Sequence, residues 1–329
     1  MSELRWNPVL QEWLVTATHR QDRTFLPPAG FCPLCPTTPG GFPTEIERED
    51  FEFVVFDNKF PSLSQQAPPP SVESSDFYPV RPAAGACEVV LYTPEHTATL
   101  TDLSEEKIFQ LVEVWKDRYL DLGKREDVDY VFIFENKGEA IGVTIHHPHG
   151  QIYAFPFVPP KIQREIDGEN EHFAKTNRCL HCDIVDDELK QQERLIAANE
   201  RFAAFVPFYA RYPYEVHIYA KQHVPSMAAF DEELAHSLAS ILKTVLSKYD
   251  NLWGISMPYM MVMHQAPTTE KTFPGSHFHI EFYPPYRTKD KLKYLAGCES
   301  GAGTFVNDTL PEEKARELRA AAPVTELPL

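Results

Sequence analysis

The chain has 329 residues, enough for one large domain or two domains of ordinary size. Hydrophobic residues make up 43% and charged residues 24%, a balance that excludes a disordered or fibrous chain. The net charge of −17 disfavours general binding to nucleic acid, because an acidic surface repels phosphate groups. No stretch approaches the roughly 18 unbroken apolar residues that cross a bilayer, and the first residues lack the pattern of a secretory signal. We therefore expect a cytoplasmic protein with no membrane partner.

The spacing of apolar residues predicts helices and strands. Strand-like runs lie, in chain order, at 51–56, 89–92, 130–134, 151–155, 202–206, 215–219, 259–264 and 277–283. Residues 102–122 and 231–249 repeat apolar side chains at the i, i+3, i+4 spacing of half-buried helices. Both segments begin with acidic residues, which suit the helix dipole. A short terminal helix is expected after Pro311.

The same signals occur twice in the same order. The first half carries C-P-L-C at 32–35, a histidine in T-P-E-H, a long predicted helix and H-P-H-G-Q at 147–151. The second half carries C-L-H-C at 179–182, a histidine in K-Q-H, a long predicted helix and H-F-H-I-E at 277–281. This order indicates an internal duplication.

The two halves are expected to join near 159–177, which divides the chain into residues 1–165 and 166–329. The first half is longer by about the length of the segment 61–84, which is rich in Pro, Ser and Ala. That segment is predicted to be an inserted surface loop.

Four of the six cysteines form two C-x-x-C pairs in a chain for which no export is expected, so metal binding is favoured over disulfides. Zinc takes four Cys or His ligands at tetrahedral corners. The sequence therefore predicts about two zinc sites per chain, with the ligand sets Cys32, Cys35, His96 and His147, and Cys179, Cys182, His223 and His277. For the first set, the alternative is that His96 caps the following helix and His147 only packs in the interior. For the second set, the alternative is two buried free cysteines and an unrelated surface His223.

The motif H-P-H-G-Q is predicted to be the catalytic strand. Side chains alternate across a strand, so residues 147, 149 and 151 share a face. Pro148 keeps His147 extended and fixes the direction of its carbonyl, and Gly150 lets a substrate approach the backbone. A histidine held by a carbonyl at one ring nitrogen offers the other nitrogen as a nucleophile. The alternative is a run of histidines on a surface strand.

H-P-H-G-Q, preceded by F-E-N-K-G at 134–138, resembles the galactose-1-phosphate uridylyltransferases, a branch of the histidine triad superfamily. The likeness covers roughly residues 5–320 and includes C-P-L-C, N-K-F-P, T-P-E-H-T and F-Y-P-P. It implies an α+β fold of two fused histidine-triad-like halves, each an antiparallel sheet with a long helix, and a homodimer. It also implies that His149 is uridylylated, that Gln151 holds the transferred phosphoryl group, and that the first Cys/His set binds structural zinc.

The resemblance implies further substrate contacts. Two arginines lie near the nucleotide phosphates and ribose, two asparagines lie in the active site (one of them contacting the nucleotide), and a hydroxyl contacts phosphate. A charged pair recognises the hexose. These residues are Arg20, Arg23, Asn58, Asn136, Thr144, Lys293 and Glu299. Cys298 stands where some members have tyrosine, and Phe305 stands roughly where they have a sugar-binding glutamine.

Some members of this family bind iron through three histidines and a glutamate. The matching residues form an alternative second metal set, Glu165, His264, His279 and Glu281, in which Glu281 replaces a histidine. The internal repeat favours zinc at the Cys₂His₂ set instead. In the frame of that repeat, His279 corresponds to His149 but lacks the H-P-H-G-Q setting, so a structural second half is expected.

The expected reaction transfers UMP from UDP-glucose to galactose 1-phosphate in two steps. Histidine triad hydrolases carry a third histidine where this chain has Gln151. A neutral amide binds a phosphoryl group but does not act as acid or base, which favours transfer over hydrolysis. The alternatives are a related phosphorylase or transferase acting on ADP-glucose, and a non-catalytic zinc-stabilised nucleotide-binding protein.

Overall fold

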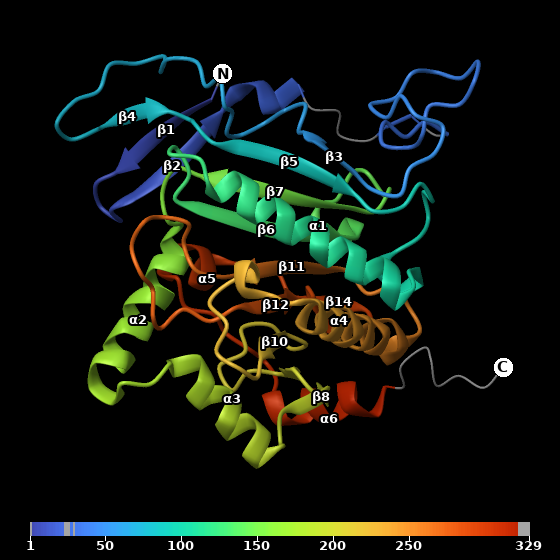
Figure 1. Cartoon of the computed structure of the whole chain (residues 1–329), viewed down its shortest axis with the longest axis vertical. Coiled ribbons are helices and arrows are strands. Elements are labelled where there is room, and N and C mark those ends of the chain that lie inside the picture. The colour runs from blue at the N-terminus through green and yellow to red at the C-terminus, as the bar shows by residue number, and fades with distance from the viewer. Residues whose placement is uncertain (1, 23–26, 29, 322–329) are drawn as a thin grey trace.

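The computed structural model describes residues 2–22, 27–28 and 30–321. Within this part of the chain, nine strands form one antiparallel sheet that crosses the whole molecule (Figure 1). Their order in the sheet is β3 (Val54–Asp57), β5 (Ala86–Leu91), β7 (His149–Phe155), β6 (Tyr130–Lys137), β11 (Tyr259–His264), β12 (His279–Tyr283), β10 (Val216–Ala220), β9 (Phe202–Phe205) and β8 (Leu195–Ala198).

The two halves of the sheet meet where β6 pairs with β11, and Glu135 lies opposite Met261 in this register. Each half contributes one long helix, α1 (Glu105–Gly123) or α4 (Glu232–Trp253), and the two helices lie side by side on the same face of the sheet (Figure 1). The predicted fold class, two fused halves that each combine an antiparallel sheet with a long helix, is therefore confirmed.

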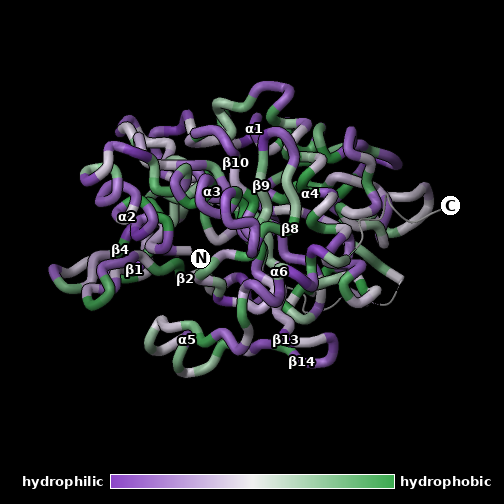
Figure 2. Tube along the Cα trace, turned by 90° about the horizontal axis from the view of Figure 1, so that it is seen from below, coloured by the Kyte–Doolittle hydropathy of each residue, from purple (hydrophilic) through white to green (hydrophobic). Residues whose placement is uncertain are grey.

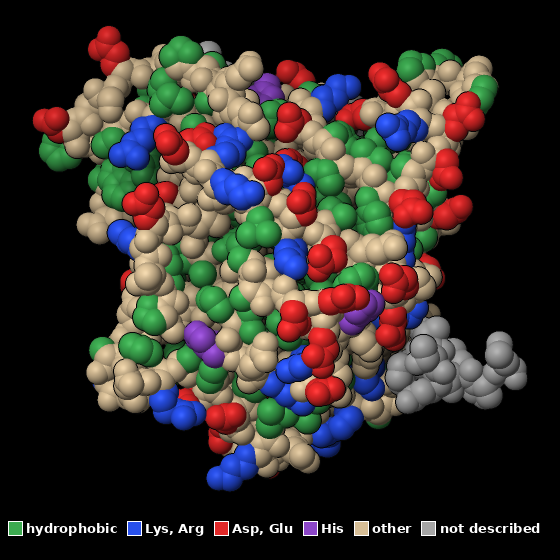
Figure 3. Space-filling model, viewed as in Figure 1, with side chains coloured by type: hydrophobic (Ala, Val, Ile, Leu, Met, Phe, Trp, Pro, Cys, Tyr) green, Lys and Arg blue, Asp and Glu red, His purple; other side chains and the backbone are tan. Residues whose placement is uncertain are grey.

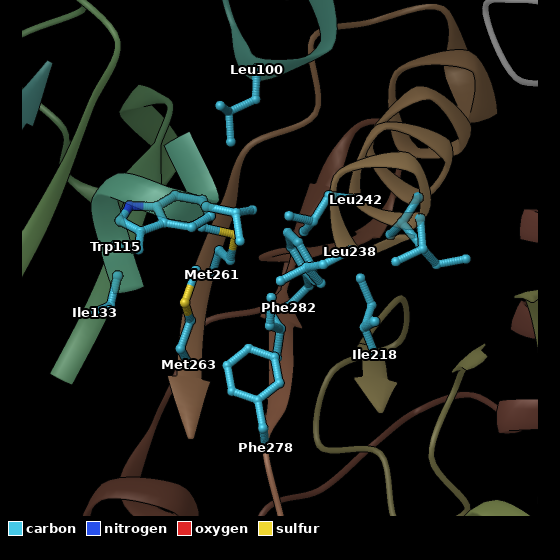
Figure 4. Close-up of a cluster of buried hydrophobic side chains, with 14 of the residues drawn as sticks. Leu100, Trp115, Ile133, Ile218, Leu238, Leu242, Met261, Met263, Phe278 and Phe282 are labelled. Atoms are coloured by element: carbon cyan, nitrogen blue, oxygen red, sulfur yellow. The ribbon is translucent and has the colours of Figure 1, made fainter. Parts of the chain in front are cut away.

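The core lies between these two helices and the sheet. Trp115 of α1 and Leu238 of α4 point toward Met261 and Phe282 on the central strands (Figure 4). All four side chains are almost completely buried, and burial of a leucine, methionine or phenylalanine side chain contributes about 1.5–3 kcal/mol of hydrophobic stabilisation. Because this cluster includes residues of both halves, one hydrophobic core connects the two halves.

Side-chain caps fix the starts of the two long helices. Ser104 Oγ accepts a hydrogen bond from the Lys107 amide at 3.1 Å, and Asp231 Oδ1 accepts one from the Leu234 amide at 2.8 Å. The predicted helix 102–122 therefore begins later than expected, after a short 3₁₀ turn at Leu100–Asp102.

The connection between the halves consists of two helices, α2 (Pro160–Thr176) and α3 (Leu180–Gln191), where the sequence predicted only a join. The expected boundary between residues 165 and 166 falls inside α2. Ile162 and Ile166 of α2 join an apolar cluster beneath the helix, but most of its other residues are polar, so the helix carries few apolar residues to signal it.

The remaining elements lie at the margins of the large sheet. The segment 61–84 is irregular except at its end, where β4 pairs with β1. Figure 2 shows α5 and the β13–β14 hairpin set apart from the rest of the chain on one side. The elements are β1 (Ser2–Asn7), β2 (Glu12–Ala17), η1 (Thr18–Asp22), β4 (Val80–Pro82), η3 (Glu139–Ile141), η4 (Met227–Ala229), β13 (Tyr286–Thr288), β14 (Lys291–Leu292), α5 (Gly297–Ala302) and the expected terminal helix α6 (Pro311–Ala320).

None of the described helices combines the length and the apolar character that a bilayer crossing requires. On the face that carries α1 and α4, acidic and basic side chains are interspersed, and the basic ones form no continuous patch (Figure 3).

Candidate active site and metal clusters

His149 is the first residue of β7, and its ring is oriented by the residue two positions earlier. His149 Nδ1 lies 2.8 Å from the carbonyl oxygen of His147. A carbonyl oxygen can only accept, so Nδ1 carries the proton and Nε2 carries the lone pair. This is the arrangement that the sequence predicted for a nucleophilic histidine.

Three cavities meet at His149, with volumes of about 330, 420 and 150 Å³. Gln151 lines the first and the third of them. Both side chains lie on the sheet face opposite the helices, since the alternate residues Ile152 and Ala154 belong to the core under α1. The cavities therefore place a half-buried imidazole and a carboxamide side by side.

Gly150 does not serve the purpose that the sequence suggested. A Cβ atom at this position would point toward Trp115 Nε1 and Val90, both 4.0 Å away, on the side of the core. Gly150 lines none of the three cavities at His149. The glycine thus faces the core rather than a substrate.

The smallest of these cavities brings together several predicted substrate contacts, namely Arg20, Asn136 and Thr144 with His149 and Gln151. Arg20 Nη1 donates to the Phe60 carbonyl at 3.0 Å and lies 3.4 Å from the Tyr153 hydroxyl. Thr144 Oγ1 is buried and has no hydrogen-bond partner among the described residues. A phosphoryl oxygen in this cavity would satisfy that hydroxyl.

Asn58 lines the 330 Å³ cavity, whose walls also include aromatic and proline residues. Its Oδ1 accepts a hydrogen bond from the Phe60 amide at 2.9 Å, which fixes the side chain. The aromatic wall, formed by Phe31, Phe56 and Phe60, was not predicted from the sequence, although N-K-F-P contains one of these residues. Arg23 lies outside the described residues.

The charged pair expected to read the hexose lies elsewhere in the chain. Lys293 and Glu299 line none of the cavities at His149. Lys293 is buried, and its Nζ donates to the Val306 carbonyl at 2.5 Å and lies 3.5 Å from Glu299 Oε1. Cys298 is exposed beside this pair, and Phe305 packs against Tyr212.

The first predicted metal set is assembled. Ligand atoms of Cys32, Cys35, His96 and His147 all lie within 4.8 Å of one another. His147 Nε2 donates to the Thr93 carbonyl at 2.9 Å, which leaves Nδ1 facing Cys35 Sγ at 3.5 Å. Burial lowers the pKa of His147 to about 4 and raises that of Cys35 to about 11, with Cys32 adding to the latter shift. A neutral imidazole with a backbone acceptor is the usual state of a zinc ligand.

The second Cys/His set repeats this geometry. Ligand atoms of Cys179, Cys182, His223 and His277 lie within 4.8 Å of one another. His277 Nε2 donates to the Ala220 carbonyl at 2.8 Å, and its Nδ1 lies 3.5 Å from Cys182 Sγ. Burial lowers the pKa of His277 to about 3. Both Cys/His clusters could therefore hold a metal ion.

The alternative set, Glu165, His264, His279 and Glu281, also comes together. His279 Nδ1 lies 2.9 Å from the carbonyl oxygen of His277, as in the His149–His147 pair. His279 is nevertheless only 2% exposed and stacks on Tyr219, with ring centroids 4.6 Å apart. His279, the counterpart of His149 in the second half, thus keeps the hydrogen bond to a carbonyl, but its burial prevents contact with substrates.

One buried acid near the site was not singled out from the sequence, although F-E-N-K-G contains it. Glu135 accepts hydrogen bonds from the hydroxyls of Tyr92 at 3.0 Å and Tyr259 at 2.9 Å. Burial raises the pKa of Glu135 to about 7, against the smaller opposing effect of the two tyrosines. The signal would have been an acidic residue inside an otherwise apolar strand.

The fold and the site define a protein of two fused histidine-triad-like halves with one accessible oriented histidine. Comparison with known proteins agrees with this class. The model of the galactose-1-phosphate uridyl transferase N-terminal domain matches residues 1–159, and the model of its C-terminal domain matches residues 165–327. The chain belongs to this family.

Among named relatives, the galactose-1-phosphate uridylyltransferase of Thermotoga maritima is 42% identical over 97% of this chain and 98% of that protein. A solved uridylyltransferase structure is 38% identical over 97% of this chain and 98% of that chain, with a TM-score of 0.86. An ADP-glucose phosphorylase from Arabidopsis thaliana, solved with bound ADP-glucose, is 25% identical over 98% of this chain and 99% of that chain, with a TM-score of 0.72.

Proposed function

We propose that this protein is a uridylyltransferase that moves UMP from UDP-glucose to galactose 1-phosphate through a covalent histidine intermediate. The observation that carries the proposal is the hydrogen bond between His149 Nδ1 and the His147 carbonyl, at the junction of three cavities. The relatives named galactose-1-phosphate uridylyltransferase support the choice of substrates.

In the first step, Nε2 of His149 attacks the α-phosphorus of UDP-glucose. A P–N bond forms, the P–O bond to the second phosphate breaks, and glucose 1-phosphate leaves without needing a proton. The imidazole becomes cationic when it is uridylylated, and its Nδ1–H remains bonded to the His147 carbonyl, which stabilises this charge. In the second step, a phosphate oxygen of galactose 1-phosphate attacks the same phosphorus and releases His149.

Gln151, Thr144 and Arg20 surround the position of the transferred phosphoryl group. The Gln151 amide and the Thr144 hydroxyl donate hydrogen bonds to its oxygens, and the Arg20 guanidinium supplies positive charge in an otherwise acidic protein. None of these groups removes a proton from water at neutral pH, so the intermediate persists until a sugar phosphate arrives. Asn58 and Asn136 are proposed to orient the nucleotide.

We propose zinc at both Cys/His clusters, about two ions per chain, because Cys₂His₂ sets suit tetrahedral zinc. The ion supplies structural cross-linking rather than a reacting group. In the first cluster, the ligand His147 is also the residue whose carbonyl orients His149, so metal binding there fixes the nucleophile. Reduced thiolate ligands suit the cytoplasm, which is the proposed location.

Lys293 and Glu299 retain the proposed role in reading the hexose. They lie away from the His149 cavities of their own chain, so this role requires a second copy of the chain. We therefore propose a homodimer in which each copy presents its Lys293–Glu299 segment to the cavities of the other copy.

The proposal is tested by intact-mass measurement of the protein after incubation with UDP-glucose or with ADP-glucose. A nucleotidyl adduct is expected with UDP-glucose, and it should disappear when galactose 1-phosphate is added. His149→Asn should form no adduct, whereas His236→Asn on α4, across the sheet, should form it as the wild type does. An adduct with ADP-glucose alone would favour the phosphorylase alternative, and binding without any adduct would favour a non-catalytic protein.

A further inference from the structure

A third polar cluster lies on the open face of the sheet, beside α2 in the C-terminal half. It consists of Glu165 on α2, His264 at the end of β11, and His279 and Glu281 on β12, with ligand atoms within 4.8 Å of one another. Glu281, His264 and His279 are buried. Two carboxylates and two imidazoles would suit a divalent transition metal if only the donor set were considered.

A fifth side chain enters this cluster and carries positive charge. Lys161 lies one helical turn before Glu165 on α2, and its Nζ is in direct contact with the Glu281 carboxylate. The same ammonium lies 3.7 Å from Glu165 Oε1 and 2.5 Å from the Tyr283 hydroxyl. Tyr283 also donates to Glu281. One oxygen of each carboxylate is therefore already bonded to an internal donor: Glu281 Oε2 to Lys161 and Tyr283, and Glu165 Oε2 to His264.

One of the two imidazoles, that of His264, is also directed differently from those of the Cys/His clusters, whereas His279 keeps Nδ1 on the His277 carbonyl and Nε2 3.8 Å from Glu281 Oε1. His147 and His277 each point one nitrogen at the cysteine sulfurs and the other at a backbone carbonyl outside the cluster. His264 instead places Nδ1 2.8 Å from Glu165 Oε2 and Nε2 3.5 Å from Glu281 Oε2. Both of its ring nitrogens face carboxylates of the set itself, so neither is reserved for an outer acceptor.

We propose that the ammonium of Lys161 takes the place of a metal ion in this cluster. The cluster is then a metal-free network of ion pairs that connects α2 to the strands β11 and β12. A divalent ion beside this ammonium would be repelled, because Glu281, His264 and His279 are buried and water between the two charges is limited. The proposal does not depend on the reaction catalysed at His149. On this proposal, Glu165, His264, His279 and Glu281 do not bind iron in this chain.

The test uses Co²⁺ as the probe, because cobalt bound by thiolates absorbs differently from cobalt bound by carboxylate and imidazole. The full-length protein and its variants are stripped of metal, loaded with Co²⁺, desalted, and measured for cobalt per chain and for cobalt–thiolate absorption. Lys161→Met should bind one more cobalt per chain than the wild type, with unchanged thiolate absorption, because the buried Glu281 and the half-buried Glu165 lose their internal cation.

Two variants serve as matched controls. Lys161→Arg keeps the positive charge and should bind the same amount of cobalt as the wild type. Lys175→Met removes an exposed lysine of the same helix that forms an ion pair with the exposed Glu171, and should also leave the count unchanged.

Equal cobalt counts in Lys161→Met and the wild type, both folded, would overturn the proposal. A second result would also overturn the proposal: the wild type binds cobalt that gives no thiolate absorption, and His264→Asn loses that cobalt. This comparison does not require Lys161→Met to fold. A protein that fails to form the uridylyl adduct but shows the cobalt gain would refute the proposed function and leave this inference intact.

Discussion

His147 takes part in two interactions that connect the first metal cluster to His149. Its Nδ1 faces Cys35 Sγ at 3.5 Å, and its carbonyl oxygen lies 2.8 Å from His149 Nδ1. Any change that moves His147 therefore changes the orientation of His149. The same pair of contacts occurs in the second half at His277, but there the oriented ring, His279, is buried.

His149→Asn should abolish both UMP transfer and the covalent adduct, because asparagine has no nucleophilic ring nitrogen. Folding and metal content should be unchanged, since His149 belongs to none of the metal clusters in the described residues. Transfer kinetics, intact mass and elemental analysis check this prediction. An adduct on any other residue of the wild type would contradict the assignment.

Gln151→Ala should retain some activity but lose roughly 10²–10³-fold in kcat, the usual effect of removing one donor to a developing oxyanion. The loss should lie mainly in kcat rather than in KM, because the donor acts most strongly in the transition state. Steady-state kinetics with UDP-glucose and galactose 1-phosphate measure both. A change confined to KM would show that Gln151 contributes only to ground-state binding.

Arg20→Gln should weaken UDP-glucose binding by roughly tenfold or more, because a hydrogen bond to a charged group is worth about 1.5–3 kcal/mol. Some thermal stability should be lost as well, since Arg20 also bonds to Phe60 and Ser62. Arg81→Gln, which removes a guanidinium that packs on Trp13, is the matched control and should leave binding unchanged. Isothermal calorimetry and thermal unfolding separate the two effects.

Cys179→Ser combined with Cys182→Ser should remove one of about two zinc ions and leave the adduct at His149 intact. Cys32→Ser combined with Cys35→Ser should remove the other ion and also lower transfer by roughly 10–100-fold, because the orientation of His149 depends on His147. Elemental analysis with kinetics checks both variants. A wild-type count near one zinc per chain would contradict the second site.

Glu135 should make the protein less stable as the pH rises. Its pKa is raised from 4.5 to about 7 in the folded state, so the folded state binds the extra proton between these values. The associated stability, up to about 3 kcal/mol, is fully present below pH 4.5 and is lost as the pH rises through 7. Glu135→Gln should lack this loss of stability. Between pH 5 and pH 8, the melting temperature of the wild type should therefore fall relative to that of the variant. Parallel melting curves would contradict the prediction.

The sequence by itself identified candidate residues that the structure brings together. Both Cys/His clusters assemble from ligands identified by the duplicated order of C-x-x-C, histidine, helix and histidine motifs. The hydrogen bond that orients His149 follows from the local geometry of three consecutive residues, which a proline restricts. The two long helices were predicted because each buries one periodic face.

Only the tertiary structure decided how these parts meet. Long-range pairing joined β6 to β11, and this contact has no local signal in either strand. The helices α2 and α3 were missed because few of their apolar side chains are buried, and the role of Gly150 was misjudged because its strand places it toward the core. The Lys161 contact depends on where α2 packs against β12, so the spacing of ligand residues alone could not show that an internal cation faces Glu281.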